Sequence, residues 1–394
     1  MKTYIVKKLL CGVIIGLFMQ GCEKFDYEKN HLFIAGLDNS PVVKFAVEDT
    51  PSTYAVAVSS SAKVSEDVNI TFELAPAEVD NYNKIHKTNY FPIPESAIEV
   101  ENWKAVIKAG KSSSSSVYVK LVSTEEFEDG CVYVVPLRIK EGTGGIDILK
   151  PAQTIFLRIS RPLDFASLDL GQITVVPFED GVLKGKNNET IALTNYTYEF
   201  KVYLTEDRPD RIRRLGQFMG DLPGSGKTNN HSSLMRFGEE GKDRNSLQWM
   251  SPEGEVLSKT LFTPNKWYLI SCVFDGSRYT MYVDGVKDSE KQGSAKSFEF
   301  TGFRMGSGEM SQYVQGRLAE MRIWNRALSA SEIKMGLCNV NNESEGLMIY
   351  WKFNEGEGTV FHDATGNGWD SDWTSSSSSY KIRWVKDESN KCIQ

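Results

Sequence analysis

One segment near the C-terminus, residues 316–333, constrains the fold more than any other part of the chain. Ala319, Met321 and Ile323 alternate with charged side chains, as in a strand that buries one face. Ser329 is followed three residues later by Glu332, which is the spacing of a capping box at the start of a helix. The segment therefore predicts a half-buried strand that leads directly into one or two turns of helix.

The same segment resembles the closing signature of laminin-G-like domains of the concanavalin A-like lectin/glucanase superfamily, in which a strand ending in Trp-Asn-Arg precedes a small helix. Residues 265–276 and 279–285 are similar to that family's central hairpin, with Asp-Gly turns that tolerate positive φ. Residues 346–368 resemble the edge strand and loop that often open such domains, but here they close the domain. The resemblance implies a jelly-roll sandwich over residues 162–394. The permuted order means that site residues of the family's first loop do not transfer.

The first half of the chain is a series of short alternating apolar runs, such as Val68, Ile70, Phe72 and Leu74. Runs of this kind, separated by Gly, Pro and Ser, predict two packed antiparallel sheets without a helix of consequence. Residues 81–83, 89–94, 108–111 and 133–139 resemble a domain of unknown function found at the N-terminus of Bacteroidetes surface lipoproteins. The fold class predicted is all-β, with an immunoglobulin-like sandwich over residues 31–161 and a concanavalin A-like one over 162–394. The resemblance implies a spacer role for the first domain.

The N-terminus has the pattern of an export signal. Lysines at 2, 7 and 8 flank an apolar run over residues 9–18, which is too short to span a bilayer. Residues 19–22, Met-Gln-Gly-Cys, resemble a bacterial lipoprotein signal, so we expect a signal peptide over 1–21, lipid on Cys22 and a tether over 22–30. The alternative is a plain signal peptide that contains a cysteine. A lipid on Cys22 predicts membrane attachment, at the outer membrane and facing the cell exterior.

Charge argues against one class of partner. Removal of residues 1–21 takes away three lysines and no acids, so the net charge of −7 becomes −10. An acidic surface disfavours nucleic acid.

Four cysteines lie beyond residue 22. Cys131 and Cys272 occur within strand patterns and are expected to be buried as small apolar residues. Cys338 and Cys392 would form a disulfide if the C-terminus folds back over the second sandwich, which export permits. None of the four has the spacing of a metal ligand.

Few motifs in the sequence indicate enzyme activity. Residues 221–228 resemble a phosphate-binding loop, but Asp221 stands where the motif needs glycine. The four histidines lack metalloprotease spacing, and residues 162–394 lack the Glu-x-Asp-x-x-Glu pattern of glucanases in this superfamily. Glu253 and Glu255 have a two-residue step but lie in an expected turn. We therefore predict no catalytic residues and no enzyme activity, with glycoside hydrolysis as the minority alternative.

Sugar binding is the remaining prediction, because it needs aromatic rings for stacking and planar polar groups for hydroxyls. Arg236, Gln248 and Trp249 lie on adjacent expected strands, although alternation puts Gln248 and Trp249 on opposite faces, so that one of them belongs to the core. Trp369 and Trp373 lie in a polar segment, where they either stack on a sugar or form an edge strand that caps the sandwich.

The polar segment that contains Trp369 and Trp373 also carries side-chain oxygen atoms that suit a calcium ion. Asp363, Asn367 and Asp370 could bind calcium, as lectins often do, or could simply stabilise turns. The function predicted is capture of an extracellular polysaccharide or oligosaccharide beside outer-membrane transporter components, with calcium optional. The competing hypothesis is adhesion to a host or matrix protein.

Overall fold

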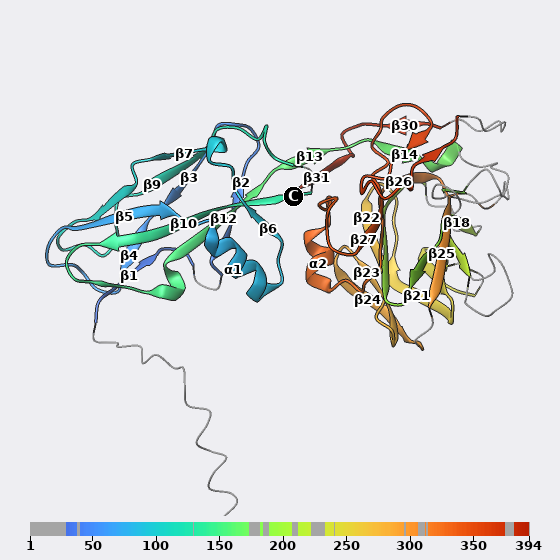
Figure 1. Ribbon diagram of the computed structural model, residues 1–394, viewed down its shortest axis with the longest axis horizontal. Helices are drawn as coiled ribbons and strands as arrows, with labels where there is room; N and C mark the ends of the chain where they lie inside the picture. Colours follow the sequence, from blue (N-terminus) through green and yellow to red (C-terminus); the bar gives the residue numbers. More distant parts are fainter. Residues whose placement is uncertain are drawn as a thin grey trace, which may run out of the picture.

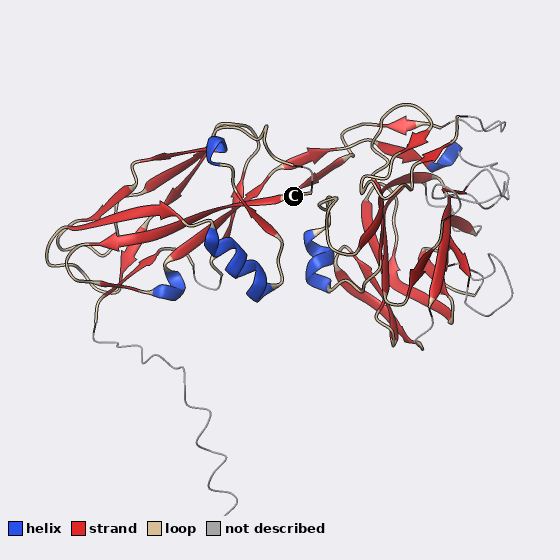
Figure 2. Ribbon diagram, in the orientation of Figure 1, coloured by secondary structure: helices blue, strands red, loops and turns tan. Residues whose placement is uncertain are grey.

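The computed structural model describes residues 29–37, 40–128, 130–172, 182–183, 189–206, 212–221, 233–239, 241–294, 297–305, 312, 314–374 and 382–393. These residues are mainly strands, with two α-helices and three short 3-10 helices among them (Figures 1 and 2). They confirm the predicted all-β class. Among them, no helix is long and apolar enough to cross a membrane. The expected signal peptide and Cys22 lie outside the described residues.

The N-terminal domain is a sandwich with a core between its sheets, formed by residues such as Ile70, Val119 and Leu137. Its largest sheet has the strand order β2-β12-β10-β5-β8 with β6 paired to β10, and the two smaller sheets have the orders β3-β9-β7 and β11-β1-β4. The strands are β1 (His31–Ile34), β2 (Val42–Ala46), β3 (Ser52–Val56), β4 (Val58–Ser60), β5 (Val68–Leu74), β6 (Tyr90–Pro92), β7 (Ile98–Glu101), β8 (Lys104–Ile107), β9 (Val117–Leu121), β10 (Val132–Gly142), β11 (Asp147–Ile148) and β12 (Thr154–Ser160).

The prediction that this domain lacks a helix of consequence is wrong, because it contains the helix α1 (Ala77–His86). Val79 is its one buried residue and packs against Val134 and Phe156, so the helix has too narrow an apolar face to give a helical period. Glu78 and Asp80 in the first turn favour its N-terminus electrostatically. Two 3-10 turns accompany it, η1 (Glu95–Ala97) and η2 (Lys150–Ala152).

The C-terminal domain packs an eight-stranded sheet, of order β24-β23-β22-β17-β26-β14-β30 with β27 on β26, over a seven-stranded sheet, of order β15-β25-β18-β19-β20-β21 with β16 on β25. Its core is rich in aromatic side chains such as Tyr198, Phe218 and Trp351. Its elements are β13 (Pro162–Asp164), β14 (Ser167–Asp169), η3 (Leu170–Gln172), β15 (Val182–Leu183), β16 (Ile191–Leu193), β17 (Tyr196–Leu204), β18 (Arg213–Asp221), β19 (Ser233–Phe237), β20 (Ser246–Ser251), β21 (Gly254–Leu261), β22 (Trp267–Phe274), β23 (Arg278–Val283), β24 (Val286–Gln292), β25 (Phe298–Met305), β26 (Gly316–Trp324), α2 (Ala330–Met335), β27 (Leu347–Trp351), β28 (Val360–Phe361), β29 (Ser371–Asp372), β30 (Trp384–Val385) and β31 (Lys391–Ile393).

The strand and helix predicted over residues 316–333 are β26 and α2. The prediction that the strand is half-buried is wrong, because Glu320 and Arg322 on its other face are buried as well. Ser329 accepts a hydrogen bond from the Glu332 backbone N–H, and the Glu332 carboxylate accepts one from the Ser329 N–H, so the predicted capping box is present. Ile333 then packs with Trp324 and Tyr350 on the outer side of the eight-stranded sheet.

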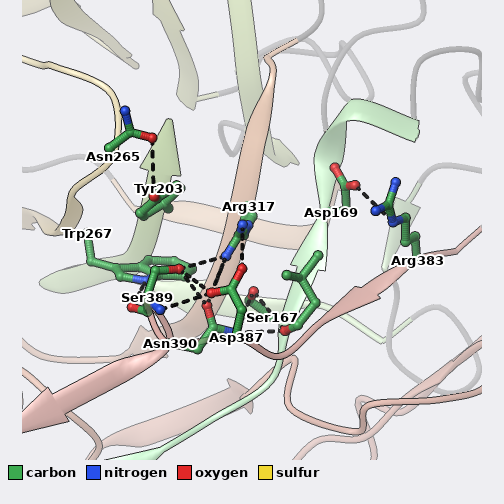
Figure 3. Close-up of polar contacts among 11 residues, drawn as sticks. Ser167, Asp169, Tyr203, Asn265, Trp267, Arg317, Arg383, Asp387, Ser389 and Asn390 are labelled. Carbon is green, nitrogen blue, oxygen red and sulfur yellow. Dashed lines mark hydrogen bonds and ion pairs between the residues drawn. The ribbon is translucent and has the colours of Figure 1, made fainter. Parts of the chain in front are cut away.

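The C-terminal segment closes the domain, as Figure 3 shows. Arg317 on β26 pairs with Asp387 at 2.9 Å and donates to Ser389 at 2.8 Å, and the Trp267 indole N–H donates to the Ser389 carbonyl. Beyond these contacts β31 pairs antiparallel with β13, which immediately follows the first domain.

The cysteines follow the sequence prediction. Cys338 and Cys392 form a disulfide, because the C-terminus does fold back over the second sandwich. Cys131 and Cys272 are buried and take no part in a disulfide.

Candidate functional site

The outer face of the seven-stranded sheet is the candidate site. In Figure 1 β18 and β25 lie on the side of the C-terminal domain that points away from the N-terminal domain. Strand alternation sends Met235 and Trp249 into the core, where they are opposite each other in the β19–β20 register. The neighbouring pair in the same register, Arg236 and Gln248, therefore lies on the outer face.

Arg236 and Gln248 belong to a connected set of polar side chains, which we call the polar ladder and which also contains Glu239, Lys242 and Glu255. The Arg236 guanidinium donates to the Gln248 side-chain oxygen and forms an ion pair with Glu239. The Gln248 amide N–H donates to Glu255 at 2.5 Å, and Lys242 pairs with Glu255 at 3.3 Å. Gln248 is only 2% exposed, so the prediction that it contacts a sugar is corrected: its amide holds Arg236 and Glu255 in place. The part-exposed guanidinium and carboxylate groups of the ladder are the ones that can bond to sugar hydroxyls.

The polar character of this face continues onto the next two strands. Arg214 lies opposite Arg236 in the β18–β19 register, and Arg304 lies opposite Gln217 in the β18–β25 register. Burial, with a smaller contribution from the Arg214 charge, lowers the pKa of Arg304 below its ordinary value. The sequence pattern indicated Arg236 and Gln248 but not Glu255, which was expected in a turn and is the second residue of β21.

The structure corrects the prediction that three tryptophans stack on sugar rings. Trp249 is 0% exposed, Trp369 3% and Trp373 6%, so none presents a ring face to a ligand. Trp249 packs edge-on against Tyr279, Trp369 against Phe300 and Trp373 edge-on against Phe361. The expectation that either Gln248 or Trp249 belongs to the core is confirmed, with Trp249 as the core residue. For Trp369 and Trp373 the capping alternative fits, since β29 next to them pairs with β28.

The residues predicted to bind calcium hold their loop together. Asp363 accepts hydrogen bonds from the backbone N–H groups of Tyr350, at 3.0 Å, and Thr365, at 3.1 Å. Asp370 accepts from the Asp363 N–H at 2.7 Å, and the Asn367 amide donates to the Met348 carbonyl at 3.0 Å. These bonds are those of turn stabilisation. Within the described residues, no group of three or more His, Cys, Asp or Glu side chains is arranged to hold a metal ion. Calcium binding by this loop stays a prediction.

A second set of charged groups lies buried beneath α2. Arg322 pairs with Glu199 at 3.3 Å and with Glu320 at 2.6 Å, and Ser271 donates to Glu199 at 2.9 Å. Burial opposes the charged form of Arg322, but Tyr350 and the carboxylates of Glu320 and Glu199 together raise the pKa of Arg322 above its ordinary value. Because both carboxylates are buried and bound to Arg322, they cannot reach a glycosidic bond in solvent.

Two segments of the chain match known protein families. Residues 180–334 match the concanavalin A-like lectin/glucanases superfamily, and residues 27–146 match a family described as an N-terminal domain. The order of the two matches along the chain confirms the predicted architecture. The sequence has no match among curated proteins.

Among similar solved structures, one covers both domains with a matching fold. A candidate carbohydrate-binding protein from Bacteroides ovatus is 20% identical, with a TM-score of 0.54 over 92% of this chain and 97% of its own. A pentraxin from Limulus polyphemus is 13% identical, with a TM-score of 0.31 over 58% of this chain and 94% of its own. The Bacteroides thetaiotaomicron protein EndoBT-3987 is 19% identical, with a TM-score of 0.28 over 33% of this chain and 31% of its own.

Proposed function

We propose that this protein is a cell-surface lipoprotein that binds an extracellular glycan through the outer face of its seven-stranded sheet. The polar ladder carries the proposal, because a row of hydrogen-bonded planar groups on one sheet face suits a ligand rich in hydroxyl groups. The concanavalin A-like match and the candidate carbohydrate-binding neighbour support the same class of ligand. The task is capture, without cleavage of the glycan.

The sequence pattern at residues 1–22 supports attachment of the protein to the membrane. Acyl chains on Cys22 would hold the protein at the outer membrane, since each buried CH₂ contributes about 0.8 kcal/mol. A protein held there would pass the captured glycan to transporter components in the same membrane.

The test is a binding screen of residues 23–394 against a polysaccharide panel, with calcium or with a chelator, and with reducing-sugar release measured in the same wells. We expect binding without release, weakened about 10- to 100-fold by Arg236→Ala or Glu255→Gln. Loss of binding in the chelator would support the calcium prediction for Asp363, Asn367 and Asp370.

The matched control is Arg278→Ala, which breaks an exposed arginine–glutamate pair on the other sheet and should leave binding unchanged. Release of reducing ends would make the protein a glycoside hydrolase. Binding that survives both ladder variants would place the glycan site elsewhere, and no glycan binding at all would favour adhesion to a protein.

A further inference from the structure

Trp103 differs from the other seven tryptophans of the chain. It is 39% exposed, whereas the others are buried or half-buried. The indole N–H groups of Trp267 and Trp384, the two half-buried ones, donate to backbone carbonyls, but that of Trp103 has no partner among the described residues. The indole with the most accessible ring and a free donor thus belongs to the N-terminal domain, for which a spacer role was expected.

The backbone holds Trp103 firmly at the edge of the sandwich. Asn102 and Trp103 connect β7 to β8, which are end strands of two different sheets, and Asn102 makes the link in the left-handed region with φ of 53°. The Trp103 carbonyl accepts a hydrogen bond of 2.8 Å from the Phe72 N–H on β5. The ring is therefore presented from a fixed position between the sheets.

A groove of about 400 Å³ opens beside this ring. Its volume is within the range of small-ligand sites, roughly 300–1,000 Å³. Leu74, Ile98 and Val100 supply an apolar floor, and Glu95 brings an exposed carboxylate. Glu73 also borders the groove, but its carboxylate is paired with Arg138 on the outer side of the sheet.

We propose that this groove binds one pyranose ring of a neutral glycan, stacked on Trp103 and hydrogen-bonded to Glu95. The C–H face of a sugar suits the indole and the aliphatic floor, while its hydroxyls can donate to the carboxylate and accept from the indole N–H. The exposed carboxylate of Glu95 opposes an anionic sugar. The N-terminal domain is then a second glycan-contacting module, separate from the polar ladder, and two contacts along one polysaccharide strengthen binding by avidity.

The test is hydroxyl-radical footprinting of residues 23–394, with mass spectrometry, in the presence of neutral gluco-, manno- and xylo-oligosaccharides. We expect a bound oligosaccharide to lower oxidation of Trp103 several-fold. Trp103→Ala should weaken binding about tenfold, and Trp103→Phe, which keeps a stacking ring, should retain most of it. Tyr118→Ala removes another exposed aromatic ring, on a neighbouring strand of the same domain, and should change nothing.

The outcomes separate this site from the proposed function. Protection over residues 233–257 with unchanged oxidation of Trp103 overturns the groove proposal and leaves the polar ladder in place. Loss of binding in Trp103→Ala together with normal binding in Arg236→Ala supports the groove and overturns the ladder. Equal losses in Trp103→Ala and Tyr118→Ala overturn the groove, and the absence of protection anywhere overturns both.

Discussion

Lys201 shows how single residues set pH dependence in this fold. Its ammonium group is buried on β17 beneath the C-terminal segment, 3.4 Å from the Cys338 carbonyl and over the Phe165 ring. Burial lowers the pKa of Lys201 to about 8, although the charge of Glu320 opposes the shift. Between pH 8 and 10.5 the unfolded chain therefore binds more protons at this residue than the folded chain does.

The free energy of unfolding should consequently rise with pH across that window, because stability increases wherever the unfolded state holds the extra proton. We expect a gain on the order of 2 kcal/mol between pH 7.5 and 9.5 for the wild type relative to Lys201→Met, measured by urea denaturation. Lys287→Met, on exposed β24, is the control and should follow the wild type. Parallel pH profiles for the wild type and Lys201→Met would contradict the assignment.

At the scale of elements, α2 and α1 illustrate what local sequence can and cannot predict. The capping box of α2 involves residues three apart, so the sequence alone located the start of the helix. α1 buries Val79 alone, and its existence depends on packing against Val134 and Phe156, which lie 55 and 77 residues further along the chain than Val79.

Ser329→Ala tests the contribution of the cap. Removal of the side-chain acceptor should lower the free energy of unfolding by about 1 kcal/mol. Ser331→Ala changes the same residue type at an exposed position in the first turn of the helix and should lower the free energy of unfolding much less. Equal midpoints for Ser329→Ala and wild type in chemical denaturation would show that the cap does not stabilise the domain.

At the scale of the whole molecule, the two sandwiches meet through the loop before β10 and the segment after α2. Asn341 donates to the Cys131 thiol at 3.2 Å across this boundary. Gly130 has φ of 78°, and a Cβ there would lie 2.0 Å from the backbone of Val340. The close approach of the two domains therefore requires glycine at residue 130.

Gly130→Ala should force the domains apart. Its matched control is Gly145→Ala, which also has positive φ but no heavy atom within 4 Å of the added Cβ, so that it reports the backbone cost alone. We expect Gly130→Ala to increase the radius of gyration in X-ray scattering and to separate two calorimetric transitions, while Gly145→Ala does neither. A scattering profile of Gly130→Ala identical to that of the wild type would mean that the contact does not hold the domains together.

The sequence by itself determined the all-β class, the strand and capped helix over residues 316–333, and the opposite facing of Gln248 and Trp249, because alternation and capping act over a few residues. It also identified Cys338 and Cys392 as a pair, conditional on the path of the C-terminus. Only the tertiary structure decided which tryptophans face solvent. Trp369 and Trp373 lie in a polar segment yet are buried, and Trp103 lies between strands yet is exposed. Exposure of a side chain depends on segments packed over it from elsewhere in the chain, which local sequence does not specify.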